Sequence, residues 1–112
     1  MFVIATDWKL RTAVRAELRE RGVDALGMES AEDAGRALGL GEVPAAVVLE
    51  ATAELAADAG IQKLVGRVPT VLIASRTETV ALPDVAVVFY RPVSVGAIVA
   101  KVGEMLARGE SA

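Results

Sequence analysis

Four polar residues follow short apolar runs in this sequence, and their side chains have the chemistry to bind an ion or a small ligand. They are Asp7, Glu50, Ser75 and Arg91, and the runs are Phe2–Ala5, Ala45–Leu49, Thr70–Ala74 and Val85–Tyr90. Asp7 and Glu50 could hold a divalent cation together. Two carboxylates without a third anionic or carbonyl ligand make a weak site, so we expect no metal and no cofactor.

The composition excludes several other kinds of chemistry. The 112 residues include no Cys and no His, which removes thiol nucleophiles, imidazole acid–base catalysis and the usual zinc sites. The sequence contains no nucleophile–base pair and no phosphate-cradling Gly-rich loop, so we expect no enzyme. The net charge is −3 and no basic patch stands out, which argues against a nucleic-acid partner.

The apolar runs predict the strands that position these side chains. Each run is short and continuous, which is typical of strands buried on both faces of a parallel sheet. Val23–Met28 is more polar and predicts an edge strand. The segments between the runs have helical periodicity. The predicted helices are Trp8–Arg21 capped by Thr6 or Asp7, a short helix opened by Ser30–Asp33 with Ala34, Ala37 and Leu38 buried, Ala53–Val65, and a last helix after Pro92 capped by Ser94.

Alternation of strands and helices predicts an α/β fold, a flavodoxin-like three-layer sandwich whose five parallel strands have the order 2-1-3-4-5. The segment Ser75–Asp84 is short for a parallel crossover, so the fourth helix is expected to be shortened or missing. We expect one domain at 1–108 and a frayed tail at 109–112. The first apolar run is too short for a signal peptide or a membrane span, which predicts a cytoplasmic protein without membrane contact.

Ligands of open α/β sheets bind beyond the carboxyl ends of the strands, where the winding direction reverses. In the predicted order this point lies between the first and third strands. Ala5, Thr6 and Asp7 come at the end of the first strand, and Glu50 follows the third. The ends of the next two strands carry Ala74 and Ser75, and Tyr90 and Arg91.

Three stretches of the chain resemble the bacterial response-regulator receiver domain of two-component signal transduction. FVIATDWKLR (2–11) resembles the first strand and helix start, RGVDALGMESAEDAGRAL (21–38) the second strand and helix, and VVFYRPVSV (87–95) the fifth strand and last helix. The resemblance covers nearly the whole chain. It implies a domain that accepts a phosphoryl group on an aspartate with the help of Mg²⁺.

The residues that a receiver uses are replaced here. Ala5 and Thr6 fall where the acidic pair is expected, and Asp7 comes one place late. Glu50 falls at the phosphoacceptor, Ala74 at the hydroxyl position beside Ser75, and Arg91 at the lysine. The resemblance therefore implies the fold of a receiver and argues against its phosphorylation.

Glu50 and Arg91 each have two interpretations. Glu50 is either a permanent stand-in for a phosphorylated aspartate that reaches toward Arg91, or a solvated glutamate at a strand end, and we favour the solvated residue. Arg91 is either a recognition residue or a strand-end charge whose stem packs on the sheet edge. The resemblance implies a cis peptide bond between Arg91 and Pro92.

The aromatic residues near this edge are open to similar alternatives. Trp8 is either a cover over the vacant pocket, which we favour, or an exposed interaction anchor. Tyr90 either takes part in switching, as the matching position of receivers does, or packs at the sheet rim. The row Arg11, Arg15 and Arg19 is interpreted as a solvated helix face.

The function that we expect is a phosphorylation-independent signalling or scaffolding module that binds another protein or itself. The expected binding surface comprises the shortened fourth segment, the fifth strand and the last helix, and the same surface would also form a homodimer. The alternatives are a phosphoacceptor receiver and a small anion- or metal-binding domain that uses Asp7, Glu50, Ser75 and Arg91.

Overall fold

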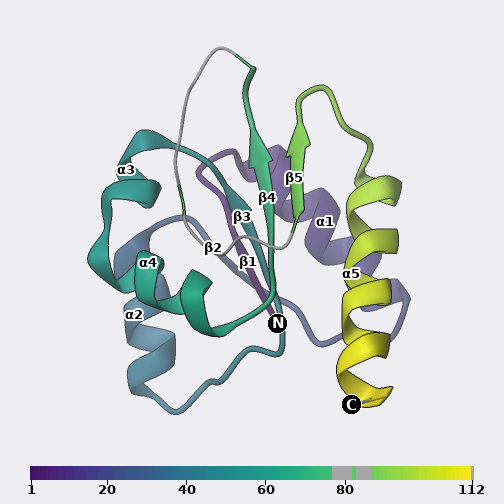
Figure 1. The fold of residues 1–112 in the computed structure, drawn as a ribbon, viewed down its shortest axis with the longest axis horizontal. Coiled ribbons are helices and arrows are strands. Elements are labelled where there is room, and N and C mark those ends of the chain that lie inside the picture. Colours follow the sequence, from purple (N-terminus) through teal and green to yellow (C-terminus); the bar gives the residue numbers. More distant parts are fainter. Residues whose placement is uncertain (77–81, 83–86, 112) are drawn as a thin grey trace.

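Five parallel strands form one sheet, and helices cover both of its faces (Figure 1). The computed structural model describes residues 1–76, 82 and 87–111. The strand order is β2-β1-β3-β4-β5, and every strand pair is parallel, so the predicted sheet is confirmed. The strands are β1 Phe2–Ile4, β2 Leu26–Met28, β3 Val47–Glu50, β4 Thr70–Ala74 and β5 Val87–Tyr90.

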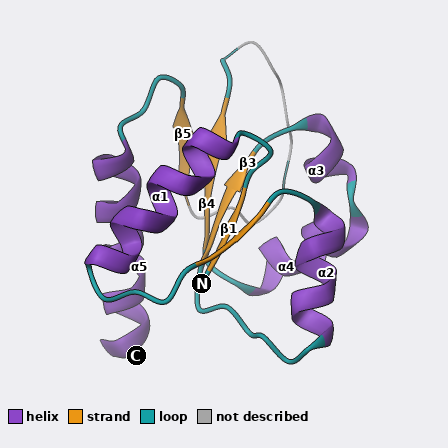
Figure 2. Cartoon of the chain, turned by 180° about the vertical axis from the view of Figure 1, so that it is seen from behind, coloured by secondary structure: helices purple, strands orange, loops and turns teal. Residues whose placement is uncertain are grey.

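The core lies in two layers, because alternate residues of each buried strand point to opposite faces of the sheet. Ile4, Leu49 and Leu72 contribute to one cluster and Val3, Val48 and Val71 to the other. Helices α2, α3 and α4 complete the first cluster, while α1 and α5 complete the second, and Figure 2 shows these two groups on opposite sides of the sheet. Because both faces are covered, the strands are apolar without alternation.

Local caps set the ends of the helices, whose bounds are α1 Trp8–Glu20, α2 Ala31–Gly39, α3 Ala53–Ala57, α4 Ala59–Arg67 and α5 Val95–Ser111. Asp7 accepts hydrogen bonds from the first backbone N–H groups of α1, Ser30 from Asp33 of α2, and Ser94 from Ala97 of α5. These three caps were predicted from the sequence and are confirmed.

The predicted helix Ala53–Val65 is wrong in one respect, because Asp58 divides it into α3 and α4. Asp58 has extended backbone angles and its carboxylate accepts a hydrogen bond from the backbone N–H of Ile61. A side chain that satisfies a helix N-terminus in this way favours a new start over continuation. Leu38 was expected in the core but is exposed on α2, where only Ala34 and Ala37 are buried.

Other predictions concern the parts of the chain that the structure describes incompletely. The shortened fourth helix was predicted within Ser75–Asp84, where residues 77–81, 83 and 84 lie outside the described residues. Helix α5 continues to Ser111, past the predicted domain boundary at 108, and fraying of the tail stays a prediction. Among the described helices, none is long and apolar enough to cross a bilayer.

Candidate functional site

Two carboxylates from different strand ends meet at the carboxyl edge of the sheet. Asp7 follows β1 as the N-cap of α1, and Glu50 is the last residue of the neighbouring strand β3. The pairing of β1 with β3 brings these residues together from positions 43 apart in the sequence. The edge predicted from strand order therefore holds the charged cluster.

Glu50 is anchored by the backbone of the β1–α1 junction. Its Oε1 accepts hydrogen bonds from the backbone N–H groups of Thr6, at 2.9 Å, and Asp7, at 3.2 Å. Its side chain is only 13% exposed. The interpretation of Glu50 as a solvated residue is therefore wrong, because two backbone donors and a cation hold it against the protein.

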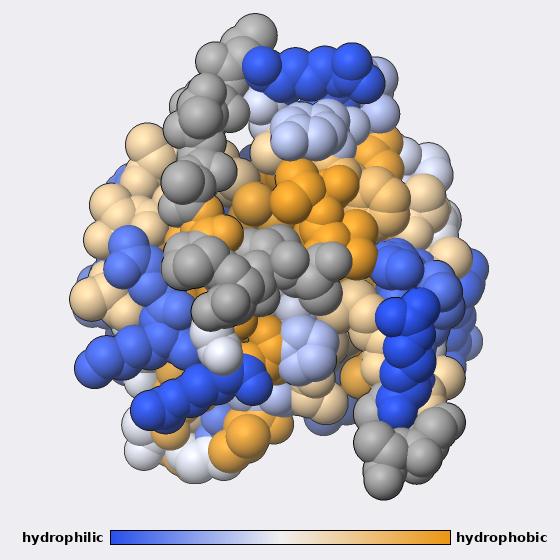
Figure 3. Space-filling view, viewed as in Figure 1, coloured by the Kyte–Doolittle hydropathy of each residue, from blue (hydrophilic) through white to orange (hydrophobic). Residues whose placement is uncertain are grey.

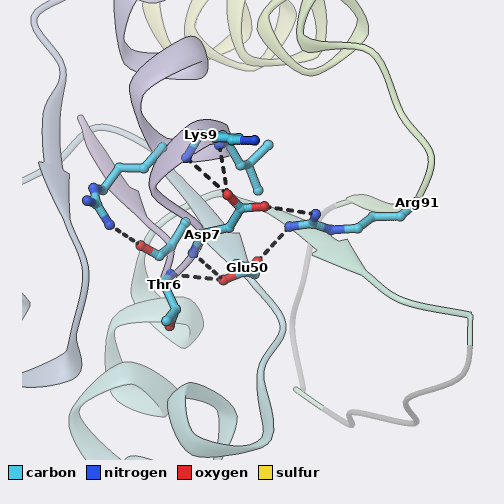
Figure 4. Close-up of polar contacts among 8 residues, drawn as sticks. Thr6, Asp7, Lys9, Glu50 and Arg91 are labelled. Atoms are coloured by element: carbon cyan, nitrogen blue, oxygen red, sulfur yellow. Dashed lines mark hydrogen bonds and ion pairs between the residues drawn. The ribbon is translucent and has the colours of Figure 1, made fainter.

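Arg91 supplies that cation and joins both carboxylates (Figure 4). One terminal nitrogen of its guanidinium lies 2.6 Å from Oε2 of Glu50, and the other lies 3.2 Å from Oδ2 of Asp7. Its backbone N–H donates to the carbonyl oxygen of Ala74, which fixes the residue to the end of β4. The peptide bond from Arg91 to Pro92 is cis, so that prediction is confirmed.

The two oxygens of the Asp7 carboxylate have different hydrogen-bond partners. Oδ1 accepts from the backbone N–H groups of Lys9 and Leu10, and Oδ2 faces Arg91. The hydrogen bond from Leu10 and that from the Arg91 guanidinium favour the charged form, so they lower the pKa of Asp7 below its ordinary value. Asp7 is therefore ionised over the whole neutral range.

Every carboxylate oxygen of Asp7 and Glu50 accepts at least one hydrogen bond from the protein. The guanidinium also cancels one of the two negative charges, which leaves the cluster with one net negative charge. Mg²⁺ needs an octahedral shell of oxygens and gives up its waters reluctantly. Within the described residues, no group of three or more His, Cys, Asp or Glu is arranged to hold a metal.

The other residues of the predicted site lie at the same edge in supporting positions. Ala5 is buried after β1, and its carbonyl oxygen accepts a hydrogen bond from the Arg11 side chain at 2.7 Å. Thr6 is exposed and contributes its backbone amide to Glu50. Ala74 is the buried last residue of β4, and Ser75 follows it.

The two aromatic residues point largely to solvent. Trp8, the first residue of α1, is 61% exposed, and Tyr90, the last of β5, is 52% exposed. A hollow of about 410 Å³ beside the ion pairs is lined by Leu10, Ile73, Arg91, Pro92 and Val93. Trp8 is not part of this lining, and its role as a cover over the edge between β1 and β3 stays a prediction.

Sequence reasoning missed the role of Arg11 and Arg15. They were assigned to a solvated helix face, but Arg11 donates to the carbonyl oxygen of Ala5 and Arg15 to that of Ala25. Their stems pack against Gly27 of β2, where an added Cβ would lie 3.3 Å from Arg11. Gly27 inside a predicted strand was a signal of such a close approach.

No family model and no curated protein matches this sequence. Solved structures do match it across nearly its whole length. A CheY-like receiver domain protein from Methanospirillum hungatei superimposes with a TM-score of 0.79 at 13% identity, covering 99% of this chain and 96% of that one. A receiver protein from Burkholderia phymatum gives 0.76 at 20% identity, with 95% and 94% covered.

An orphan response regulator of H. pylori also matches, with a TM-score of 0.70 and 20% identity over 95% of this chain and 96% of that chain. Structural similarity at such low sequence identity shows the fold, whereas the function has to be argued from the residues of the site. Together with the strand order and the parallel sheet, these matches show that the chain has the fold of a response-regulator receiver domain.

Proposed function

We propose that this chain is a receiver-like signalling module that works without phosphorylation and acts by binding another protein. The observation that carries the proposal is the double ion pair of Arg91 with Glu50 and Asp7. It engages the side chain at the position where the receiver resemblance places the phosphoacceptor.

Metal binding at this edge competes with the guanidinium. A cation that approached both carboxylates would have to displace Arg91 and the backbone donors, because Oε1 of Glu50 already accepts from Thr6 and Asp7. It would gain few ligands in return, since Ala5 and Thr6 carry no carboxylate. We therefore assign the charge-neutralising role at this edge to Arg91.

Phosphoryl transfer needs an attacking oxygen that is free and a metal that neutralises the developing charge. Oε2 of Glu50 lies 2.6 Å from the Arg91 guanidinium, and Oε1 is held by two amides. Neither oxygen is presented to a phosphate donor. The double ion pair therefore supports a site that does not react.

The ion pairs join three segments that are far apart in the sequence. They connect the start of α1, the end of β3 and the loop that leads from β5 into α5. A permanent carboxylate–guanidinium contact holds these segments in one arrangement. In this respect Glu50 acts as the stand-in for a phosphorylated residue, so the domain presents one surface constantly.

The exposed aromatic residues beside the cluster are suited to a protein partner. Trp8 and Tyr90 flank Asp7 and Arg91 in the sequence and are more than half exposed. Tryptophan and tyrosine are the residue types most enriched at energetic centres of interfaces. We assign Trp8, Tyr90 and Arg91 to the binding surface, and a homodimer through β5 and α5 stays a prediction.

Incubation with acetyl phosphate and Mg²⁺, followed by intact-mass measurement, tests the proposal. The expected result is an unchanged mass for this chain. The positive control is the variant Thr6→Asp/Glu50→Asp/Arg91→Lys, which supplies an acid, an aspartate acceptor and a lysine at the matching positions. A phosphoryl adduct on the unaltered chain, mapped to Glu50 or Asp7, would overturn the proposal.

A further inference from the structure

A second hollow lies at the opposite, amino-terminal end of the strands, between α2, α4 and the loop before β3. Its volume is about 440 Å³. The lining is mainly aliphatic, with two basic residues on α4, and comprises Leu38, Val43, Pro44, Gly60, Lys63, Leu64, Arg67 and Val68. On the face drawn in Figure 3, hydrophilic side chains gather over α4 beside exposed apolar surface.

The two basic residues of this groove have no acidic partner among the residues that the structure describes. Lys63 and Arg67 are exposed on α4, and neither forms an ion pair with any residue in the described part of the chain. An occupant of this groove should therefore carry an aliphatic side chain for the walls and a carboxylate for the rim. That combination defines the chemistry of the partner.

The chain presents this combination itself, in the loop next to the groove. Leu40 and Val43 are 86% and 85% exposed, and Glu42 between them is exposed. Gly41, which follows the C-cap residue of α2, has a φ of +91°, a left-handed conformation that an L residue rarely adopts. Glu42 forms no ion pair with the residues that the structure describes.

We propose that this groove binds a second copy of the chain, with Leu40 of one copy against the aliphatic walls of the other and Glu42 opposite Lys63 and Arg67. The loop and the groove lie next to each other on one surface. A two-fold axis near Val43 would therefore place the loop of each copy against the groove of the other copy, so that the dimer contains each contact twice. Such a self-complementary patch is the geometry of a C2 dimer. The surface is distinct from β5 and α5.

The proposal names a partner for the interaction module and does not depend on whether the Arg91 cluster accepts phosphate. Sedimentation of the full chain at rising concentration should show a shift from 11.6 kDa to twice that mass. The patch is small, so a weak, concentration-dependent dimer is expected. A chain that stays monomeric up to millimolar concentration would overturn the proposal.

Reversing the charges of the loop and of the groove tests whether these two surfaces form the dimer. Glu42→Lys should weaken self-association about tenfold, because like charges then face each other across the axis. Lys63→Glu/Arg67→Glu should weaken it similarly. An equal mixture of the two variants should recover association, since each contact of the mixed dimer again pairs opposite charges. All three positions are exposed, so circular dichroism should show unchanged folding.

The control is Ala100→Arg on the exposed side of α5, which should leave the dimer intact. A dimer that is lost with Ala100→Arg but insensitive to Glu42→Lys would place the interface on α5 and overturn the proposal. Failure of the two charge variants to recover association when mixed would also count against it, whatever the phosphorylation experiment gives.

Discussion

Arg91 connects two carboxylates that hydrogen bonds from elsewhere already hold in place. Because the guanidinium is a planar fork, one nitrogen can meet Glu50 and another Asp7, an arrangement that the single ammonium of lysine cannot reproduce. Glu50 is the more buried of the two acids. Loss of the guanidinium would therefore leave Glu50 as the more buried of two carboxylates without a cationic partner.

Arg91→Ala should lower the free energy of unfolding at pH 7. The expected loss is about 1–2 kcal/mol, reduced from the value for a fully buried pair because Arg91 is partly exposed. Arg91→Lys should lose less, since one ammonium still faces a carboxylate. Urea unfolding measures both values.

The matched control is Arg108→Ala, which breaks an exposed pair with Glu104 on α5. Exposed pairs of this kind contribute about 0.5 kcal/mol or less. Equal losses for Arg91→Ala and Arg108→Ala would show that the cluster is an ordinary surface pair.

The ionisation of Asp7 makes the free energy of unfolding depend on pH in the acidic range. Its pKa is lowered in the folded chain by the Leu10 amide and by Arg91, so folding favours the ionised form. The stabilisation is complete above the ordinary Asp value of about 4 and is lost as the pH falls through the lower folded value. Asp7→Asn should therefore make the loss of stability on acidification shallower.

Thermal unfolding at a series of pH values between neutral and strongly acidic measures this slope. The control is Asp24→Asn, a carboxyl outside the cluster. Parallel curves for the unaltered chain and Asp7→Asn would contradict the role given to the Leu10 and Arg91 hydrogen bonds.

At the scale of elements, Asp58 divides one predicted helix into two. It ends α3 and begins α4, and its carboxylate accepts from the Ile61 amide. Asp58→Ala should lower the free energy of unfolding by about 1 kcal/mol, the usual effect of losing an N-cap. Asp58→Asn keeps the acceptor and should lose much less, as measured by urea unfolding. Indistinguishable stabilities for Asp58→Ala and the unaltered chain would refute the cap.

Continuous apolar runs made three of the strands predictable. The runs at 2–5, 45–49 and 70–74 correspond to β1, β3 and β4 within a residue or two, because both faces of these strands are buried. Asp58 was not predictable in the same way, since the stretch from 53 to 65 contains no proline that would break a helix. The cap that divides the helix depends on backbone angles that periodicity does not contain.

At the scale of the whole molecule, strand order predicted which residues share an edge but not how their side chains meet. Asp7 and Arg91 lie 84 positions apart, and the parallel sheet brings both to the edge that holds Glu50. Whether Glu50 points to solvent or to Arg91 depends on side-chain geometry and on the two amides at the start of α1. That is why its solvated interpretation, reasonable for an isolated glutamate, was wrong.

We propose that the protein's own donors, and not a metal, satisfy the charge at this edge. The amides of Thr6 and Asp7 report on it directly, because both donate to Oε1 of Glu50. Two-dimensional NMR of the ¹⁵N-labelled chain during a Mg²⁺ titration should show no saturable shift of these two signals through millimolar concentrations. A saturable shift of both signals, with a single apparent dissociation constant, would contradict the account.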